Sequence, residues 1–301
     1  MNLQAPVILF VYNRPWHTQQ MLDALRANTG IAETDIFVFA DGPKKEATPD
    51  DQKAIQEVRG LCEAIDWAKS VTLTTQPNNV GLANHVIFGI NTVFKTHDSV
   101  IVLEDDLLTS PGFLTYCNEG LELYKDDAHV YAINGFQFPI DFDQTSTFLC
   151  PLATSSWGWA TWKRAWSCFQ EEASHTTLLQ NHKHLSRRFN FADYDYVNML
   201  DNPNSWAIRW YYSVFLRNGL GVFPTRSLVE NIGLDSSGTH GGTIEGKQER
   251  LNITIAHKKQ QEIDLIKYAK MLDYFSEDND INRRIKRVSL IEKVFNRMSK
   301  R

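Results

Sequence analysis

The sequence contains no long hydrophobic run. No stretch of about 18 apolar residues, the length that a membrane-spanning helix requires, occurs among its 301 residues. The first ten residues also lack the basic start and the long apolar core of a signal peptide. We therefore expect a cytoplasmic protein without a membrane span.

Cysteine is scarce, and glycine-rich phosphate-binding motifs are missing. The four cysteines, Cys62, Cys117, Cys150 and Cys168, are widely spaced and form no Cys-x-x-Cys pair. This favours buried free thiols over disulfides or zinc ligands. No helix pattern opens with a dinucleotide-binding glycine motif or a P-loop, which argues against a simple dehydrogenase or kinase.

Apolar residues are plentiful and follow an alternating pattern. The chain is 43% hydrophobic and 22% charged, which is enough apolar material for one large catalytic domain. Short runs rich in β-branched and aromatic residues alternate with segments whose apolar residues recur every three or four positions. The expected strands are Val7–Tyr12, Ile36–Ala40, Val71–Thr74, Ser99–Leu103 and Val130–Ile133, and the expected helices are Trp16–Ala27, Asp50–Ala68, Leu82–Lys95 and Phe113–Tyr124. This order predicts an α/β fold with a mostly parallel central sheet and helices on both faces.

The second half of the chain is less regular. We expect a strand at Phe148–Leu152 and a helix at Ser205–Leu216, with the very aromatic segment Ser155–Trp166 between them. The stretch Gly233–Gly246 contains five glycines among polar residues, a composition typical of a mobile loop over a site. Helical patterns predominate from Gln248 onward.

Three consecutive acids follow the fourth expected strand. Glu104, Asp105 and Asp106 come directly after four apolar residues, at the carboxyl end of a strand, where open α/β sheets place their ligands. A solvated acidic loop is the alternative, since charge runs usually face water. The apolar run before the acids and the helix pattern after them favour a site. Such a site suits Mg²⁺ or Mn²⁺ held together with substrate phosphates.

Polar residues also follow the first three expected strands. Asn13 and Arg14 follow the first strand, Asp41 the second, and Asn79 with Gly81 the third. A nucleotide needs this set of groups: donors for the base, a carboxylate for ribose hydroxyls, and a cation or backbone N–H groups for phosphate. Each feature alone is also typical of a turn. Their placement on successive strand ends favours a nucleotide site.

Together these motifs resemble those of metal-dependent glycosyltransferases of the GT-A fold, and most of all the N-acetylglucosaminyltransferase I family with related bacterial sugar transferases. The resemblance covers about residues 5 to 245. It rests on the motifs Asn13-Arg14-Pro15, Asp41, Asn79-Val80-Gly81-Leu82, Glu104-Asp105-Asp106 with Pro111 and Phe113, Gly158-Trp159, Asn231-Ile232-Gly233 and His240-Gly241. It implies a GT-A catalytic domain at 1–245, with a nucleotide-binding half at 1–126 and an acceptor half at 127–245, followed by a helical segment at 246–301.

The resemblance also implies residue roles. Asp106 coordinates the Mn²⁺ or Mg²⁺ that bridges the donor diphosphate, and His240 touches metal or phosphate. Asp105 holds the ribose and Glu104 the transferred sugar. Asp41 and Asn79 line the nucleoside pocket. A carboxylate deprotonates the acceptor hydroxyl, whose in-line attack inverts the anomeric carbon.

One position departs from the family pattern. Where the family has an aspartate as general base near a helix start, this chain has Ala207, after Trp206. Asp235 beside the glycine-rich stretch is the preferred replacement. Further candidates are Glu230, Asp193 and Asp195.

Several tryptophans are candidates for stacking on a sugar ring. Trp157 and Trp159 flank Gly158 in an expected loop, and Trp206 stands beside Ala207. Trp162, Trp166 and Trp210 lie at helical spacing, which favours the core. The histidines His85, His182 and His184 are expected at the surface or in the core.

The C-terminal end is strongly basic. Residues 283–301 contain eight Lys and Arg residues and one Glu, on a chain of net charge −5, with apolar residues at helical spacing. An amphipathic helix on an anionic membrane surface and a helix packed on the body with a solvated basic face both fit this pattern. No aromatic-interleaved basic motif supports nucleic-acid binding.

The leading hypothesis is therefore an inverting, metal-dependent glycosyltransferase that uses a nucleotide-diphosphate sugar, preferably a UDP-sugar. The expected acceptor is a glycan. One candidate is a lipid-linked oligosaccharide, as used in the assembly of surface polysaccharides. The first alternative is a carbohydrate- or nucleotide-binding relative of these transferases that has lost its general base. A sugar-1-phosphate nucleotidyltransferase is the second, although residues 6–15 contain no glycine where such enzymes usually have a glycine-rich loop.

Overall fold

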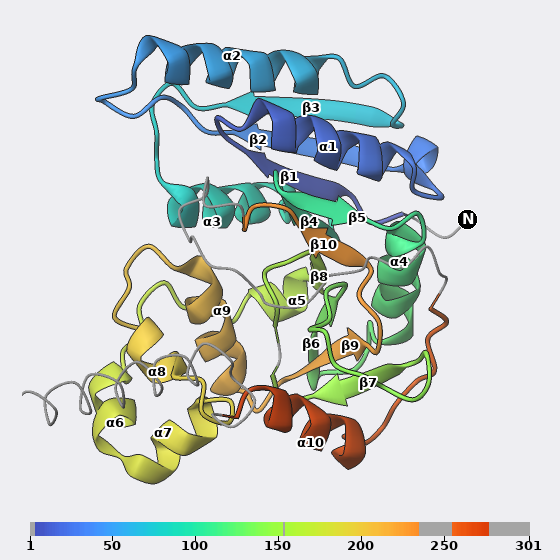
Figure 1. Cartoon of the computed structure of the whole chain (residues 1–301), viewed down its shortest axis with the longest axis vertical. Coiled ribbons are helices and arrows are strands. Elements are labelled where there is room, and N and C mark those ends of the chain that lie inside the picture. The colour runs from blue at the N-terminus through green and yellow to red at the C-terminus, as the bar shows by residue number, and fades with distance from the viewer. Residues whose placement is uncertain (1–3, 153, 235–254, 277–301) are drawn as a thin grey trace, which may run out of the picture.

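The computed structural model describes residues 4–152, 154–234 and 255–276, and it has an α/β fold built on one mixed eight-stranded sheet (Figure 1). The strand order is β3-β2-β1-β4-β8-β6-β9-β7, and a two-stranded ribbon pairs β10 with β5. The strands are β1 (Val7–Val11), β2 (Asp35–Ala40), β3 (Ser70–Thr75), β4 (Ser99–Glu104), β5 (Leu107–Thr109), β6 (Val130–Asn134), β7 (Thr147–Cys150), β8 (Trp159–Trp162), β9 (Leu220–Pro224) and β10 (Val229–Asn231). The helices are α1 (Pro15–Arg26), α2 (Pro49–Glu63), α3 (Leu82–Val93), α4 (Phe113–Leu123), α5 (Lys163–Trp166), α6 (Thr176–Asn181), α7 (Lys183–Phe189), α8 (Tyr196–Met199), α9 (Trp206–Phe215) and α10 (Leu265–Tyr274).

The first four strands of the sheet are parallel, as the sequence predicts. β1 pairs with β2 and β4, and β2 pairs with β3, all in parallel register. Every residue of β1 is buried, because helices cover both faces of such a sheet. α2 ends at Glu63 rather than at the expected Ala68, since Lys69 N already donates to Thr34 O and aligns the chain with β2.

The second half of the sheet is mixed. β8 runs antiparallel to both β4 and β6, and β7 runs antiparallel to β9. The expected strand at Phe148–Leu152 is β7, shifted to Thr147–Cys150. The aromatic segment Ser155–Trp166 contains β8 and the short helix α5.

Helices cover both faces of the sheet. α1 packs on α2, and Leu114 N at the start of α4 donates to Asn28 Oδ1 just after α1, 3.0 Å away. On the opposite face α3 packs on α9, and Trp166 Nε1 of α5 donates to Asn91 Oδ1 at 2.9 Å. None of the described helices is long and apolar enough to cross a membrane.

The described C-terminal segment belongs to the body of the protein. Residues 255–262 form no helix, contrary to the expectation, and His257 Nε2 and Gln260 N donate instead to Tyr116 O and Tyr124 OH. Met271 of α10 is fully buried in a second core cluster that α9 also lines. The predicted mobile loop at Gly233–Gly246 lies outside the described residues beyond Leu234, as does the basic end at 283–301.

The cysteines are free thiols, as expected. Cys62, Cys117 and Cys150 are buried, and Cys168 is half-buried. Burial raises the pKa of Cys62 and of Cys150 to about 12, so neither thiol is reactive at neutral pH.

Candidate functional site

The carboxyl ends of β1 to β4 bring the predicted polar residues to one edge of the sheet. Arg14 lies three residues after β1, Asp41 directly after β2 and Asn79 four residues after β3, while Glu104 is the last residue of β4. Because β1 lies between β2 and β4 in the sheet, residues far apart in sequence become neighbours here. Ligands of open α/β sheets bind at this edge.

An ion pair joins β1 to the acid triplet. Arg14 Nη1 lies 2.8 Å from Asp106 Oδ2 and 3.6 Å from Asp105 Oδ1. The three side chains are between 13% and 19% exposed, so they are largely shielded from water but not fully buried. The guanidinium supplies positive charge beside three adjacent acids, which would otherwise repel one another.

The acid triplet is electrostatically crowded. Burial, followed by the charges of Asp106 and Asp105, raises the pKa of Glu104 to about 8. Burial and the charge of Asp106 raise the pKa of Asp105 to about 7, although Arg14 acts in the opposite direction. A further cation at this site would favour the ionised forms of both acids.

The ribbon of β5 and β10 covers the acid triplet from one side. Ile232 N donates to Asp106 O at 2.9 Å, and Gly233 N donates to Asn231 Oδ1 at 2.7 Å. A Cβ on Gly233 would collide with Asp106 Oδ2 and lie 3.0 Å from Arg14 Nη1. Any residue other than glycine would therefore have to move the ion pair.

Asp41 forms the centre of a second cluster at the same edge. Its carboxylate accepts hydrogen bonds from Gly42 N at 2.8 Å, Asn79 Nδ2 at 2.9 Å and Val80 N at 3.0 Å. We call residues 41–42 and 78–81 with these bonds the Asp41 cradle. The cradle fixes the loop after β3 against the end of β2.

Two further residues support the Asp41 cradle. A Cβ on Gly42 would lie 2.5 Å from the backbone of Asn78, so glycine permits an approach that a larger residue would block. Arg59 of α2 donates from Nη2 to Gln76 O at 2.8 Å and to Asp41 O at 3.3 Å. The sequence analysis predicted neither the close approach at Gly42 nor the hydrogen bonds of Arg59. The glycine directly after the aspartate at the end of a strand could have indicated the close approach.

The remaining predicted nucleotide-binding residues lie around this edge. Gly81 has a φ of +80° and caps the start of α3. Asn13 is half-buried, and its Nδ2 lies 3.5 Å from Asp51 Oδ1. His85 of α3, which was expected at the surface or in the core, is buried against Phe10 and Phe39, and burial lowers its pKa.

The three tryptophans proposed for sugar stacking have different surroundings. Trp157 is half-buried, packs on Phe136 at 4.6 Å and precedes β8, whose antiparallel direction brings it to the end of β4. Trp159 is fully buried, and Trp206 is 3% exposed and stacks on it at 5.7 Å. Neither of these two rings has a face open to a ligand, so in this structure both are core residues. The expected loop around Trp159 is β8 instead.

The candidates for the general base are dispersed. Ala207 is half-buried at the start of α9. Glu230 lies on β10 opposite Leu108, whereas Asp195 caps α8 through Asn198 N, and Asp193 is exposed nearby. Asp235 and His240 lie outside the described residues.

Asp106 has the chemistry of a ligand for a hard divalent cation. Within residues 4–152, 154–234 and 255–276, no three His, Cys, Asp or Glu side chains converge as a metal-binding group. A partly exposed carboxylate that relies on substrate oxygens to complete the shell is nevertheless the usual arrangement for Mg²⁺ bound with phosphates. The residues present therefore fit a cation that binds together with a phosphorylated ligand.

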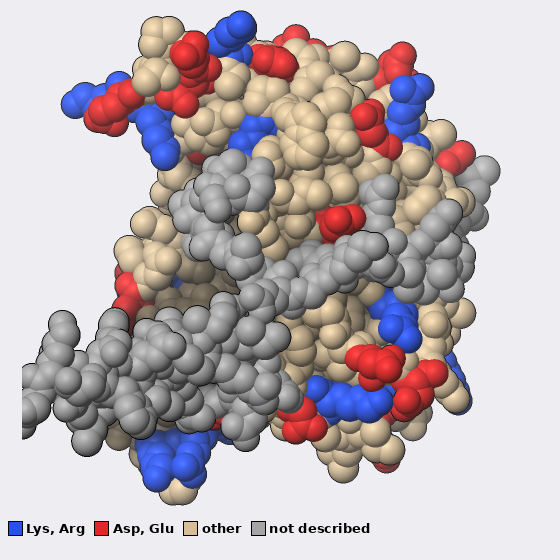
Figure 2. Space-filling view, viewed as in Figure 1, with Lys and Arg blue, Asp and Glu red and all other residues tan. Residues whose placement is uncertain are grey.

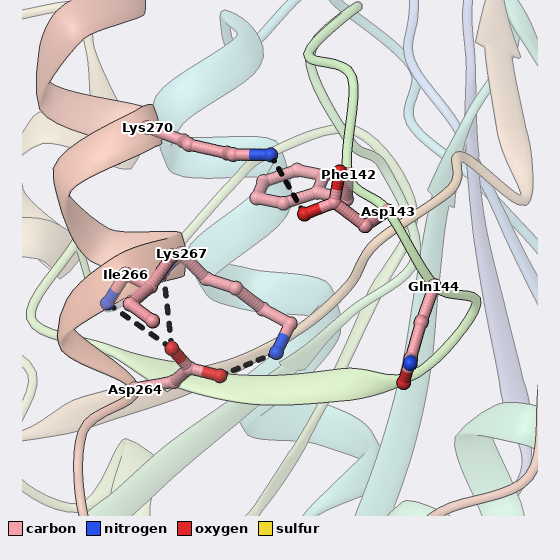
Figure 3. A pocket seen from close by; sticks show the side chains of 7 residues that line it. All are labelled: Phe142, Asp143, Gln144, Asp264, Ile266, Lys267 and Lys270. Carbon is pink, nitrogen blue, oxygen red and sulfur yellow. Dashed lines mark hydrogen bonds and ion pairs between the residues drawn. The ribbon is translucent and has the colours of Figure 1, made fainter.

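The surface over α10, at the lower right of the view, carries intermixed acidic and basic side chains (Figure 2). A hollow of about 190 Å³ lies there beside α10, away from the acid triplet (Figure 3). Asp264 accepts a hydrogen bond from Lys267, and Lys270 Nζ lies 3.2 Å from Asp143 Oδ2. These four charged side chains thus pair with one another.

Comparisons of the sequence with known proteins find no match. No protein-family model matches the chain, and no curated protein matches it. Among solved structures, the crystal structure of TarS from S. aureus overlaps 69% of this chain and 34% of that chain, with 13% sequence identity and a TM-score of 0.38. The chain thus spans about a third of the length of that structure.

Proposed function

We propose that this protein is a glycosyltransferase that moves a sugar from a nucleotide-diphosphate donor, preferably a UDP-sugar, to a hydroxyl of a glycan. The supporting observation is the joint placement of the Asp41 cradle, Arg14 and the acid triplet at the carboxyl edge of one sheet. A nucleoside, a diphosphate and a sugar need these three kinds of group in this order.

The Asp41 cradle is proposed to hold the nucleoside. Its hydrogen bonds fix Asn79 and the backbone at Val80 before any ligand arrives, which lowers the entropy cost of binding. Asn13 lies on the loop after β1, and Gly81 belongs to the cradle on the loop after β3. Asp105 binds the ribose hydroxyls in this proposal.

Arg14 and Asp106 are proposed to hold the diphosphate. A guanidinium offers paired donors that match phosphate oxygens, and Asp106 would be the protein ligand of Mn²⁺ or Mg²⁺, with His240 as a second candidate. Such an ion, when bound, neutralises charge on the departing diphosphate. In this proposal Glu104 contacts the transferred sugar, and Trp157 is the tryptophan that stacks on a sugar face.

The acceptor hydroxyl needs a base, which we assign to Asp235. Ala207 offers only a methyl group at the start of α9. Attack from the side opposite the diphosphate inverts the anomeric carbon in this proposal. A lipid-linked acceptor at an anionic membrane surface, reached through residues 283–301, belongs to the same proposal.

Ala207 also favours a second candidate function, a nucleotide-sugar-binding protein without turnover. Incubation with a panel of nucleotide sugars and Mn²⁺ separates the two. Slow release of free sugar from one donor supports the transferase, whereas binding without release supports the binding protein.

Calorimetry with UDP and Mn²⁺ tests the site itself. We expect Asp106→Ala to abolish Mn²⁺-dependent UDP binding, while Asp126→Ala, an exposed acid beyond α4, retains wild-type affinity. Unchanged binding in Asp106→Ala would refute the assignment of this edge.

A further inference from the structure

We propose that Arg14 is a built-in counter-cation that competes with the divalent metal for Asp106. The metal then binds weakly by itself and tightly only together with the donor diphosphate. This inference rests on the proposed function and adds an order of binding to it.

The ion pair is prepared by the backbone. Arg14 stands at the N-terminal end of α1 before Pro15, and its carbonyl accepts from both Thr18 N and Thr18 Oγ1, each at 2.9 Å. The start of the side chain is thereby fixed. Its Nη1 reaches Asp106 Oδ2 at 2.8 Å across 92 positions of sequence.

Gly233 lies beside the same oxygen and beside the guanidinium. A methyl group at Gly233 would collide with Asp106 Oδ2 and approach Arg14 Nη1 to 3.0 Å, which places the glycine backbone against the pair. Asp106 Oδ2 therefore pairs with a cation and also lies close to the Gly233 backbone. A metal ion that binds Asp106 therefore competes with the guanidinium for the negative charge of the carboxylate.

A diphosphate can drive that exchange. A displaced guanidinium loses its 2.8 Å contact with Asp106, and Asp105 Oδ1 lies farther away, at 3.6 Å. Phosphate oxygens accept two parallel hydrogen bonds from the guanidinium and so replace its lost contact with Asp106. In their absence the metal and Arg14 would be adjacent like charges, which repel.

The first test measures Mn²⁺ binding by calorimetry and by the electron paramagnetic resonance of free Mn²⁺. Wild-type protein should bind Mn²⁺ at least about tenfold more tightly with saturating UDP than without it. Equal affinity in the two conditions would overturn the inference, and this comparison needs no variant.

The second test changes the cation. Arg14→Gln should bind Mn²⁺ alone about tenfold more tightly than wild type, whereas Arg14→Lys, which keeps the charge, should remain closer to wild type. Arg26→Gln removes an exposed cation from the same helix and should change nothing. Circular dichroism checks that each variant is folded.

The outcomes separate this inference from the proposed function. If Arg14→Gln binds Mn²⁺ no better than wild type, while UDP with Mn²⁺ still binds the wild type, the competition is refuted and the nucleotide site stands. If the wild type binds no UDP either with or without Mn²⁺, both proposals fail.

Discussion

Glu104 is the residue whose burial has the clearest consequence for pH dependence. Its pKa of about 8, against an ordinary 4.5, means that the folded state binds a proton that the unfolded state releases. This contribution to stability is complete below about pH 4.5 and is lost as the pH rises through 8. Glu104→Gln should therefore be more stable than wild type at pH 9, by at least about 1 kcal/mol.

Urea unfolding between pH 6 and pH 9 measures this effect. Glu57→Gln, an exposed position on α2, should retain the wild-type slope of stability against pH. A Glu104→Gln variant with that same slope would show that the surroundings of the carboxyl group do not disfavour its ionised form.

Two glycines make a matched pair for testing the Asp41 cradle. Gly42→Ala places a methyl group 2.5 Å from the Asn78 backbone, whereas a methyl group at Gly60 of α2 meets nothing within 4 Å. We expect Gly42→Ala to weaken UDP binding more than tenfold, because the loops after β2 and β3 must separate, a loss of about 1.4 kcal/mol or more. Gly60→Ala should stabilise the fold by about 0.5–1 kcal/mol and leave binding intact.

Single residues show how far sequence reasoning reached at the site. The meeting of Asp41, Asn79 and the acid triplet at one edge was predictable because each follows a strand of the parallel half of the sheet. The pairing of Arg14 with Asp106 was not predictable, since it joins positions 92 apart. The core positions of Trp159 and Trp206 were missed because neighbouring aromatic residues carry no sign of which side chain packs on which.

Among the elements, the irregular segment of residues 255–262 has a testable attachment to α4. The His257 ring stacks on Tyr116 at 4.4 Å, and its Nε2 donates to Tyr116 O at 2.8 Å. Burial lowers its pKa to about 4, so its contribution to stability is present above its ordinary pKa of 6.5 and is lost as the pH falls toward 4.

His257→Phe keeps the stacking and removes the titration. Its stability should fall less than that of the wild type between pH 7 and pH 5, by about 1–2 kcal/mol, in urea titrations at each pH. His184→Phe, at an exposed position, provides the control with a wild-type slope. The attachment is refuted if His257→Phe and wild type lose stability equally.

The elements themselves were predictable to different degrees. β1 to β4 are runs of apolar and β-branched residues, and their pattern is unambiguous. β8 was missed because Trp159-Ala160-Thr161-Trp162 alternates large and small residues within a longer aromatic segment. β5 and β10 have three residues each, too few for a pattern, and they form by pairing with one another.

At the scale of the whole molecule, α10 closes the second core cluster. Met271 is fully buried there, whereas Leu265 on the same helix is 72% exposed. Met271→Ala should destabilise the protein by about 2–5 kcal/mol, and Leu265→Ala should stay within about 0.5 kcal/mol of wild type. A single unfolding transition for Met271→Ala, with its midpoint at a lower denaturant concentration than in the wild type, would show that α10 unfolds together with the rest of the protein. An unchanged midpoint would contradict this.

The cluster of Trp159, Trp166, Trp206 and Trp210 gives the protein an optical signature of its own. In four of their six pairs the ring centroids lie 5.0–6.1 Å apart, close enough for the excited states of the indoles to couple. Two of these rings belong to α9 and two to β8 and α5, so any displacement of α9 relative to the sheet alters the coupled circular dichroism band. Spectroscopists can thus follow movement beside Ala207 without attaching a label.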